Sequence, residues 1–168
     1  SSKEVLCRTQ LTDRDAVIME LLRVLAYHRG IGNVDDAFAG VLQREEEMST
    51  IVAPGIAMPH ARIDAIQDLV VAVATSQSGI AFKEGEGGVV HLVILILTPK
   101  DRPGAYLQAL SSLSKILKDP KVAGNVAALE TPEDVARFFE RGGLILPDYV
   151  CAGDIMTRDV PALLENDT

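Results

Sequence analysis

The sequence Val-Val-His-Leu-Val-Ile-Leu-Ile-Leu at residues 89–97 decides the fold class. It is apolar without alternation except at His91, and residues 69–74 form a second run of the same kind. Such runs are typical of central strands that are covered on both faces of a sheet. Helices are therefore expected on both sides of these strands, and the simplest arrangement is an α/β fold with a mixed central sheet flanked by helices on both faces.

Helical patterns precede these strands. A capping box at Thr12 and Asp15 predicts the start of a first helix, which Gly30 should end in the left-handed conformation. Asn33 can cap a second helix that runs to the acidic residues 45–47. The apolar face of the first helix is formed by Val17, Ile18, Leu21, Leu22 and Leu25. A short strand is expected before both helices, over residues 4–8.

Helical patterns also follow the strands. Residues 103–119 have leucines at helical spacing, and Thr131 followed by Pro132 is a helix start before a last apolar face. Gly142 and Gly143 should close that last helix. The leucines of the first of these helices are Leu107, Leu110, Leu113 and Leu117.

Composition limits the class of function. The chain has 168 residues and a formal net charge of -8, without the dense basic run that duplex binding requires, so no nucleic-acid partner is expected. Cys7 and Cys151 are the only cysteines and have no neighbours at metal-ligand spacing, which fits a reducing cytosol. The apolar run at residues 89–97 is far shorter than the roughly 20 residues that span a bilayer, so no direct membrane insertion is expected.

Residues 50–60 contain the candidate chemistry. They include two prolines, a glycine and short extended stretches, so they cannot form a continuous helix, and we expect a loop placed against the sheet. Pro59 fixes its own φ and favours an extended Met58, so that His60 is presented from a stiff strand end. A neutral imidazole nitrogen can attack phosphorus near neutral pH, and this chemistry requires no metal and no cofactor. Taken alone, a Pro-His loop is more often structural than catalytic.

A phosphoryl group on His60 would need hydrogen-bond donors around its oxygens. Guanidinium, hydroxyl and backbone N–H groups favour such a charge, and each charge-assisted hydrogen bond contributes on the order of 1.5–3 kcal/mol. The sequence offers Arg44, Ser49, Thr50 and the loop that contains Gly55.

A family resemblance gives these residues a common interpretation. Arg-Glu at residues 44–45, Ser-Thr at 49–50 and Gly-Ile-Ala-Met-Pro-His at 55–60 resemble the signature of the fructose/mannitol-type enzyme IIA domains of the phosphotransferase system, with their nitrogen-regulatory relatives. The resemblance extends over residues 3–142 and implies an enzyme IIA sandwich, which we place at residues 1–147. It implies that His60 is the phosphoryl acceptor and that Arg44 stabilises the phosphoryl group.

The resemblance also implies partners. The donor would be an HPr-type phosphocarrier protein, and the chain would be a cytoplasmic phosphotransferase component that forms a phosphohistidine intermediate for sugar uptake or regulation. Tyr106 stands where the family has a second histidine. Its hydroxyl can donate a hydrogen bond but, with a reference pKa of about 10, supplies no positive charge. Lys100, Arg102 and the helix start after Pro103 are expected to compensate.

The other two histidines receive structural interpretations. His28 lies in the last turn of the first predicted helix, where it can meet the helix dipole. His91 lies within an apolar strand, where a ring hydrogen-bonded to backbone is the more frequent case. A metal-dependent hydrolase built on His28, His60 and His91 is the weakest alternative, because their spacing has none of the short intervals of zinc motifs.

Residues 148–168 resemble the truncated opening of a cystathionine-β-synthase-like (CBS) domain. The chain is therefore interpreted as a piece of a longer protein, with a fused or associated membrane transporter as a further partner. This leaves a second functional hypothesis, a regulatory or sensory domain of a larger transporter or channel that is not phosphorylated. Phosphorylation of His60 distinguishes the two.

Overall fold

The computed structural model describes residues 1–142 except residues 65 and 84–87. The predicted opening of a CBS-like domain at residues 148–168 and the closing Gly143 lie outside the described residues. No helix within the described part of the chain is long and apolar enough to cross a membrane.

A mixed six-stranded sheet forms the centre of the molecule, as the two apolar runs predict. Strands β5 (Val70–Ala81) and β6 (Val89–Pro99) pair antiparallel, and β1 (Val5–Leu6) pairs parallel to β5 at one edge. The other side of β6 pairs parallel with both β3 (Ile56–Ala57) and β4 (His60–Ile63). Strand β2 (Ile51–Ala53) pairs antiparallel to β3. The first predicted strand is shorter than expected, because residue 4 belongs to a 3-10 helix, Ser2–Glu4, and residues 7 and 8 form a turn in which Arg8 has φ 55.

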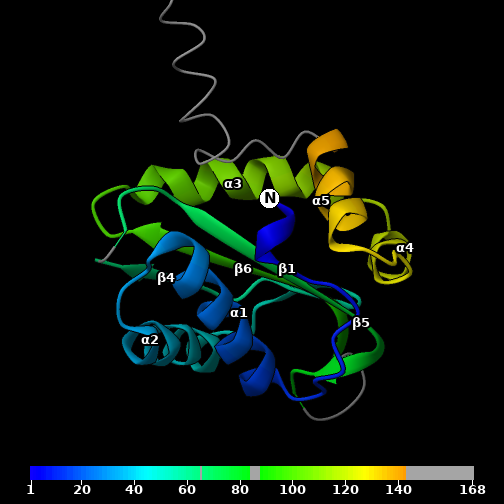
Figure 1. Ribbon diagram of the computed structural model, residues 1–168, viewed down its shortest axis with the longest axis horizontal. Helices are drawn as coiled ribbons and strands as arrows, with labels where there is room; N and C mark the ends of the chain where they lie inside the picture. The colour runs from blue at the N-terminus through cyan, green and yellow to red at the C-terminus, as the bar shows by residue number, and fades with distance from the viewer. Residues whose placement is uncertain (65, 84–87, 143–168) are drawn as a thin grey trace, which may run out of the picture.

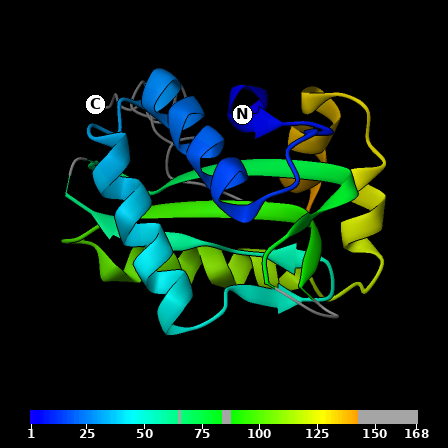
Figure 2. The same ribbon diagram turned by 90° about the horizontal axis from the view of Figure 1, so that it is seen from below.

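Helices cover both faces of this sheet. Figure 1 shows α1 (Arg14–Arg29) and α2 (Val34–Glu47) on one side, and α3 (Pro103–Ile116), α4 (Val122–Ala127) and α5 (Pro132–Arg141) on the other. Figure 2 shows α1 and α2 in front of the strands and α3 behind them. The short α4 was not predicted, since its apolar pattern spans too few residues to be recognised.

Alternation along the two central strands produces two separate cores. Side chains of β6 that face α1 and α2 include Val93, Leu95 and Leu97, whereas those that face α3, α4 and α5 include Leu92, Ile94 and Ile96. The predicted apolar face of α1 is fully buried in the first core, and Leu113 of α3 is fully buried in the second. Leu107 was placed on the same face of α3 but is 66% exposed, so that interpretation is wrong.

Most predicted helix ends are confirmed. Gly30 has φ 63 after α1, and the side chains of Asn33 and Thr131 accept hydrogen bonds from backbone N–H groups at the starts of α2 and α5. The start of α1 differs by one residue, because Asp13 and not Thr12 is the cap. The Thr12 carbonyl instead accepts a hydrogen bond from the backbone of Ala81.

Residues 50–60 are more regular than a loop. They contain β2 and β3 and lead into β4, with a turn at Gly55, whose φ of 77 suits glycine. The two prolines lie outside these strands, at positions 54 and 59, so they cost no ladder hydrogen bond. The short extended stretches expected in this segment are β2 and β3, and the expectation was wrong in that they belong to the sheet and do not form a loop against it.

Candidate functional site

His60 is the first residue of β4, and its strand pairing fixes the face on which its side chain lies. It pairs with Ile96 of β6, which belongs to the core beneath α3. Paired residues of neighbouring strands point to the same face of a sheet, so the imidazole of His60 faces α3. Pro59 is buried directly before it, and its carbonyl accepts a hydrogen bond from the backbone of Ile96, which anchors the entry to the strand.

Both ring nitrogens of His60 have a partner. Nδ1 lies 3.1 Å from the carbonyl oxygen of Met58, and Nε2 lies 3.2 Å from Nε of Arg44, in the last turn of α2. The carbonyl can only accept, so Nδ1 carries the hydrogen. The Arg44 guanidinium can only donate, so the Nε2 lone pair faces it. The contacts therefore place the nucleophilic lone pair of the neutral ring on Nε2.

Tyr106 packs against the same imidazole. The two ring centroids are 4.6 Å apart with 26° between the planes, a stacked arrangement. Tyr106 lies in the first turn of α3, whose N-terminus therefore approaches His60. The structure thus brings together Arg44, His60 and Tyr106, three residues that the sequence singled out.

A cavity of about 280 Å³ opens beside these residues. Its lining comes from the end of α2, from β4, from β6 and from the start of α3. The lining residues are Arg44, His60, Ala61, Arg62, Thr98, Pro103, Tyr106 and Leu107.

The surroundings of His60 favour the neutral imidazole. Burial lowers the pKa of His60 below its usual value, and the Arg44 guanidinium lowers it further. The Met58 carbonyl and the Glu45 carboxylate oppose that shift without reversing it. Burial also raises the pKa of Tyr106, an effect that Arg44 partly offsets, so its hydroxyl remains a hydrogen-bond donor at neutral pH. The site therefore combines a neutral nucleophile with a guanidinium and a hydroxyl.

The four predicted supporting residues do not line this cavity. Thr50 is buried, and its hydroxyl donates to the carboxylate of Glu45. The Ser49 hydroxyl accepts from the backbone of Ile51 at 3.4 Å. Arg102 donates to Asp68 at 2.9 Å. Gly55 turns toward α4, where an added Cβ would lie 3.1 Å from the Cβ of Ala123.

Arg62 and Thr98 are cavity residues that the sequence did not indicate. They pair with each other across β4 and β6, two positions beyond the pair of His60 and Ile96, so their side chains lie on the same face as the imidazole. Arg62 is exposed, and within the described residues its guanidinium has no ion-pair or hydrogen-bond partner. The signal for Arg62 was the two-residue spacing from His60, which becomes informative only once residues 60–63 are known to be a strand.

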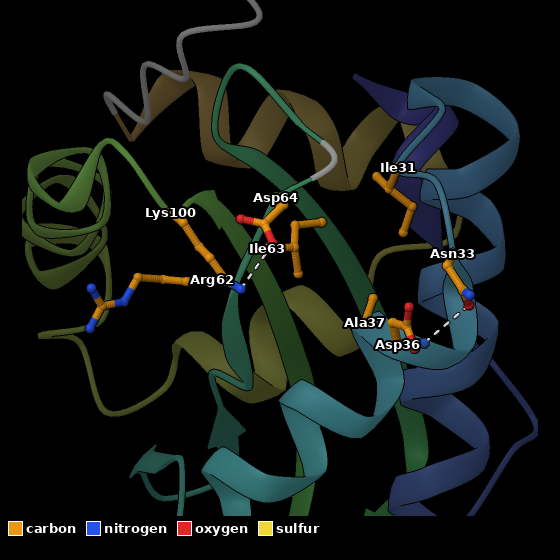
Figure 3. Close-up of a pocket in the computed structure, with 8 residues that line it drawn as sticks. All are labelled: Ile31, Asn33, Asp36, Ala37, Arg62, Ile63, Asp64 and Lys100. Carbon is orange, nitrogen blue, oxygen red and sulfur yellow. Dashed lines mark hydrogen bonds and ion pairs between the residues drawn. The ribbon is translucent and has the colours of Figure 1, made fainter.

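A second cavity of about 310 Å³ lies on the other side of Arg62 (Figure 3). Lys100 donates there to Asp64 at 3.0 Å, and Asn33 accepts from the backbone of Asp36 at 3.1 Å. In Figure 3 the side chain of Arg62 extends away from Asn33 and Asp36. Lys100, which was expected to support the phosphoryl group, does not line the cavity beside His60. It lines this second cavity and a neighbouring hollow that it shares with Arg44 and Arg62.

The remaining histidines stay apart from the site. His91 lies with Nδ1 2.9 Å from the carbonyl oxygen of Ser76, which confirms the prediction of a ring hydrogen-bonded to backbone. His28 is exposed in the last turn of α1 and meets the Tyr27 ring edge-on. Among the described residues no group of three or more His, Cys, Asp or Glu side chains could hold a metal ion.

Comparison with known proteins places this geometry in context. Residues 1–142 match the family described as "Phosphoenolpyruvate-dependent sugar phosphotransferase system, EIIA 2". The fructose-specific EIIA component of Haloferax volcanii is 36% identical over 107 residues, which are 62% of this chain and 70% of that protein. The fructose-specific EIIABC component of Bacillus subtilis is 26% identical over 123 residues, which are 73% of this chain but 19% of that protein.

Solved structures share the fold. The nitrogen regulatory protein IIA-Ntr from Neisseria meningitidis superimposes with a TM-score of 0.73 at 20% identity, over 83% of this chain and 94% of that one. Its agreement confirms the α/β sandwich with helices on both faces of a mixed sheet.

Proposed function

This chain belongs to the EIIA type 2 family of the phosphoenolpyruvate-dependent sugar phosphotransferase system, and on that premise we propose that His60 accepts and passes on its phosphoryl group. The donor is an HPr-type phosphocarrier protein. The observation that carries the proposal is the imidazole of His60, whose unprotonated Nε2 faces Arg44 beside an open cavity.

The transfer uses the lone pair on Nε2. It attacks the phosphorus of the donor phosphohistidine, so a new N–P bond forms as the donor N–P bond breaks. The hydrogen on Nδ1 stays between the ring and the Met58 carbonyl, which stabilises the charge that the ring gains. The donor supplies the phosphoryl group, so the step requires no cofactor.

Positive charge around the phosphoryl oxygens favours the phosphorylated state. The Arg44 guanidinium can release Nε2 and donate to those oxygens, and Arg62 adds a second guanidinium at the same cavity. Tyr106 and Thr98 add hydroxyl donors to the lining. In this proposal Arg62, and not Arg102, compensates for the tyrosine at the family's second histidine position.

The wider setting is also proposed. Relatives of this chain are sugar-specific components and nitrogen regulatory proteins, so the phosphoryl group would serve uptake or regulation in the cytoplasm. The B. subtilis relative is a fused EIIABC protein, which supports a fused or associated membrane transporter as a partner of this chain. We further propose that residues 148–168 begin a CBS-like domain.

The proposal is tested by intact-mass measurement after incubation with phosphoenolpyruvate, enzyme I and HPr. We expect one acid-labile phosphoryl group on the parent and none on His60→Ala. Arg62→Gln should be phosphorylated several-fold more slowly, whereas Arg102→Gln, the matched control, should resemble the parent.

Two results would overturn the assignment. One is an unphosphorylated parent when general and nitrogen-branch donors both phosphorylate a control acceptor. The other is equal phosphorylation of the parent and His60→Ala.

A further inference from the structure

Glu45 is a buried carboxylate next in sequence to Arg44. Glu45 is 7% exposed, and among the described residues it has no basic partner at ion-pair distance. Burial of a carboxylate is costly unless hydrogen bonds satisfy it. Thr50 supplies them, because its backbone N lies 3.1 and 3.3 Å from the two Glu45 oxygens and its hydroxyl donates to one of them.

Thr50 connects Glu45 to the histidine through backbone. The Thr50 carbonyl accepts a hydrogen bond from Met58 N at 2.8 Å. The Met58 carbonyl in turn accepts from Nδ1 of His60, at 3.1 Å. Four residues from three segments thus form one continuous hydrogen-bonded path from α2 to the imidazole: Glu45, Thr50, Met58 and His60.

The last turn of α2 therefore constrains the imidazole from both sides. Arg44 contacts Nε2 directly, and Glu45 is linked through Thr50 to Met58, whose carbonyl holds Nδ1–H. Rotation of the ring, or a shift of its hydrogen to Nε2, would break one contact or the other. A ring with hydrogen on Nε2 has no lone pair facing the cavity and cannot attack phosphorus from that atom.

We propose that Glu45 is a positioning residue that fixes the Nδ1–H tautomer of His60 through Thr50 and Met58. Its importance for phosphoryl transfer rests on the proposed function, whereas its effect on the tautomer does not. Glu45 does not line the cavity, so it acts on the reaction through the geometry of the ring and through the charge of its carboxylate, which raises the pKa of His60. Glu45→Gln separates the two, because it removes the charge and keeps an acceptor for Thr50 N.

The tautomer is measured by NMR on the unphosphorylated protein, with ¹⁵N-labelled histidine at a pH where the ring is neutral. In the parent, the His60 Nδ1 shift should be that of a protonated nitrogen and the Nε2 shift that of an unprotonated one. Glu45→Ala should move the two shifts toward each other as the Nε2–H form becomes populated. Glu45→Gln can still accept from Thr50 N, so it should restore most of the parent pattern.

The same variants are then phosphorylated. We expect a loss on the order of tenfold or more in the rate for Glu45→Ala, because misplacement of a reacting group by about 1 Å can cost 10²-fold. Glu46→Ala is the matched control, since Glu46 is exposed at the next position of the helix and should change neither shifts nor rate. Glu45→Met, which removes the carboxylate and fills the space better than alanine, tests the path if Glu45→Ala does not fold.

The outcomes separate the two proposals. If the ¹⁵N shifts of His60 move in Glu45→Ala but no donor phosphorylates the parent protein, the positioning role is retained and the carrier function is rejected. Unchanged shifts and rate in folded Glu45→Ala, or in Glu45→Met if the alanine variant is unfolded, would overturn the positioning role.

Discussion

At the scale of single residues, His60 depends on being neutral. A protonated imidazole has no lone pair on either nitrogen and cannot accept a phosphoryl group. Burial and the Arg44 guanidinium lower the pKa of His60 from its ordinary 6.5, so the nucleophilic form persists below that pH. The guanidinium that we propose to bind the phosphoryl group thus also favours the neutral form of the ring.

This predicts a pH dependence with a definite sign. As the pH falls from 8, the rate of His60 phosphorylation should decline with a midpoint below pH 6.5, in step with the NMR titration of the ring. Arg44→Gln removes a cation that opposes protonation, so its midpoint should move to higher pH while its maximal rate falls. A midpoint of the pH–rate profile above pH 6.5 in the parent would contradict the electrostatic argument. So would a midpoint in Arg44→Gln that lies at lower pH than that of the parent.

The residues of the site differ in how far sequence could predict them. Arg44 and His60 belong to one local motif, and Tyr106 was found by its place in the same family pattern. Arg62 and Thr98 were missed because their common face follows from the pairing of β4 with β6, a contact between distant segments. Thr50 was given a direct role, but its buried hydroxyl is already used by Glu45.

At the scale of elements, α2 is the part that delivers both Arg44 and Glu45 to the imidazole. Its start is stabilised by Asn33, whose side chain accepts from the backbone of Asp36 at 3.1 Å. Caps of this kind are visible in sequence, which is why α1, α2 and α5 were predicted well. His60 was correctly expected at a strand end, but the bounds of β3 and β4 were not predicted. Two and four residues are too few for a periodic signal, and both strands owe their pairing to β6.

Removal of the α2 cap should therefore weaken the whole domain. Asn33→Ala leaves the Asp36 N–H without its acceptor and should lower the free energy of unfolding by about 1 kcal/mol. Asn33→Ser keeps a capping oxygen and should remain within a few tenths of a kcal/mol of the parent. Urea unfolding followed by far-UV circular dichroism measures both. Equal losses in the two variants would show that the amide acts by something other than capping.

At the scale of the whole molecule, β5 and β6 belong to two cores at once. Their alternate side chains face α1 and α2 on one side and α3, α4 and α5 on the other. The site lies where the two layers meet, since Arg44 comes from α2 and Tyr106 from α3. Neither layer can separate from the sheet without exposing half of each central strand.

This shared sheet predicts that the two cores unfold together. Ile18 in α1 and Ile94 in β6 are both fully buried, one in each core. Ile18→Val and Ile94→Val should each lower the free energy of unfolding by about 0.5–1.5 kcal/mol. The double variant should lose the sum of the two single losses, because the two side chains lie on opposite faces of the sheet.

In urea, circular dichroism and the NMR signals of His60 should follow one coincident transition in every variant. If Ile18→Val instead produced an early transition by circular dichroism while the His60 signals persisted, the α1–α2 layer would be an independent folding unit, and the sheet would not couple the cores.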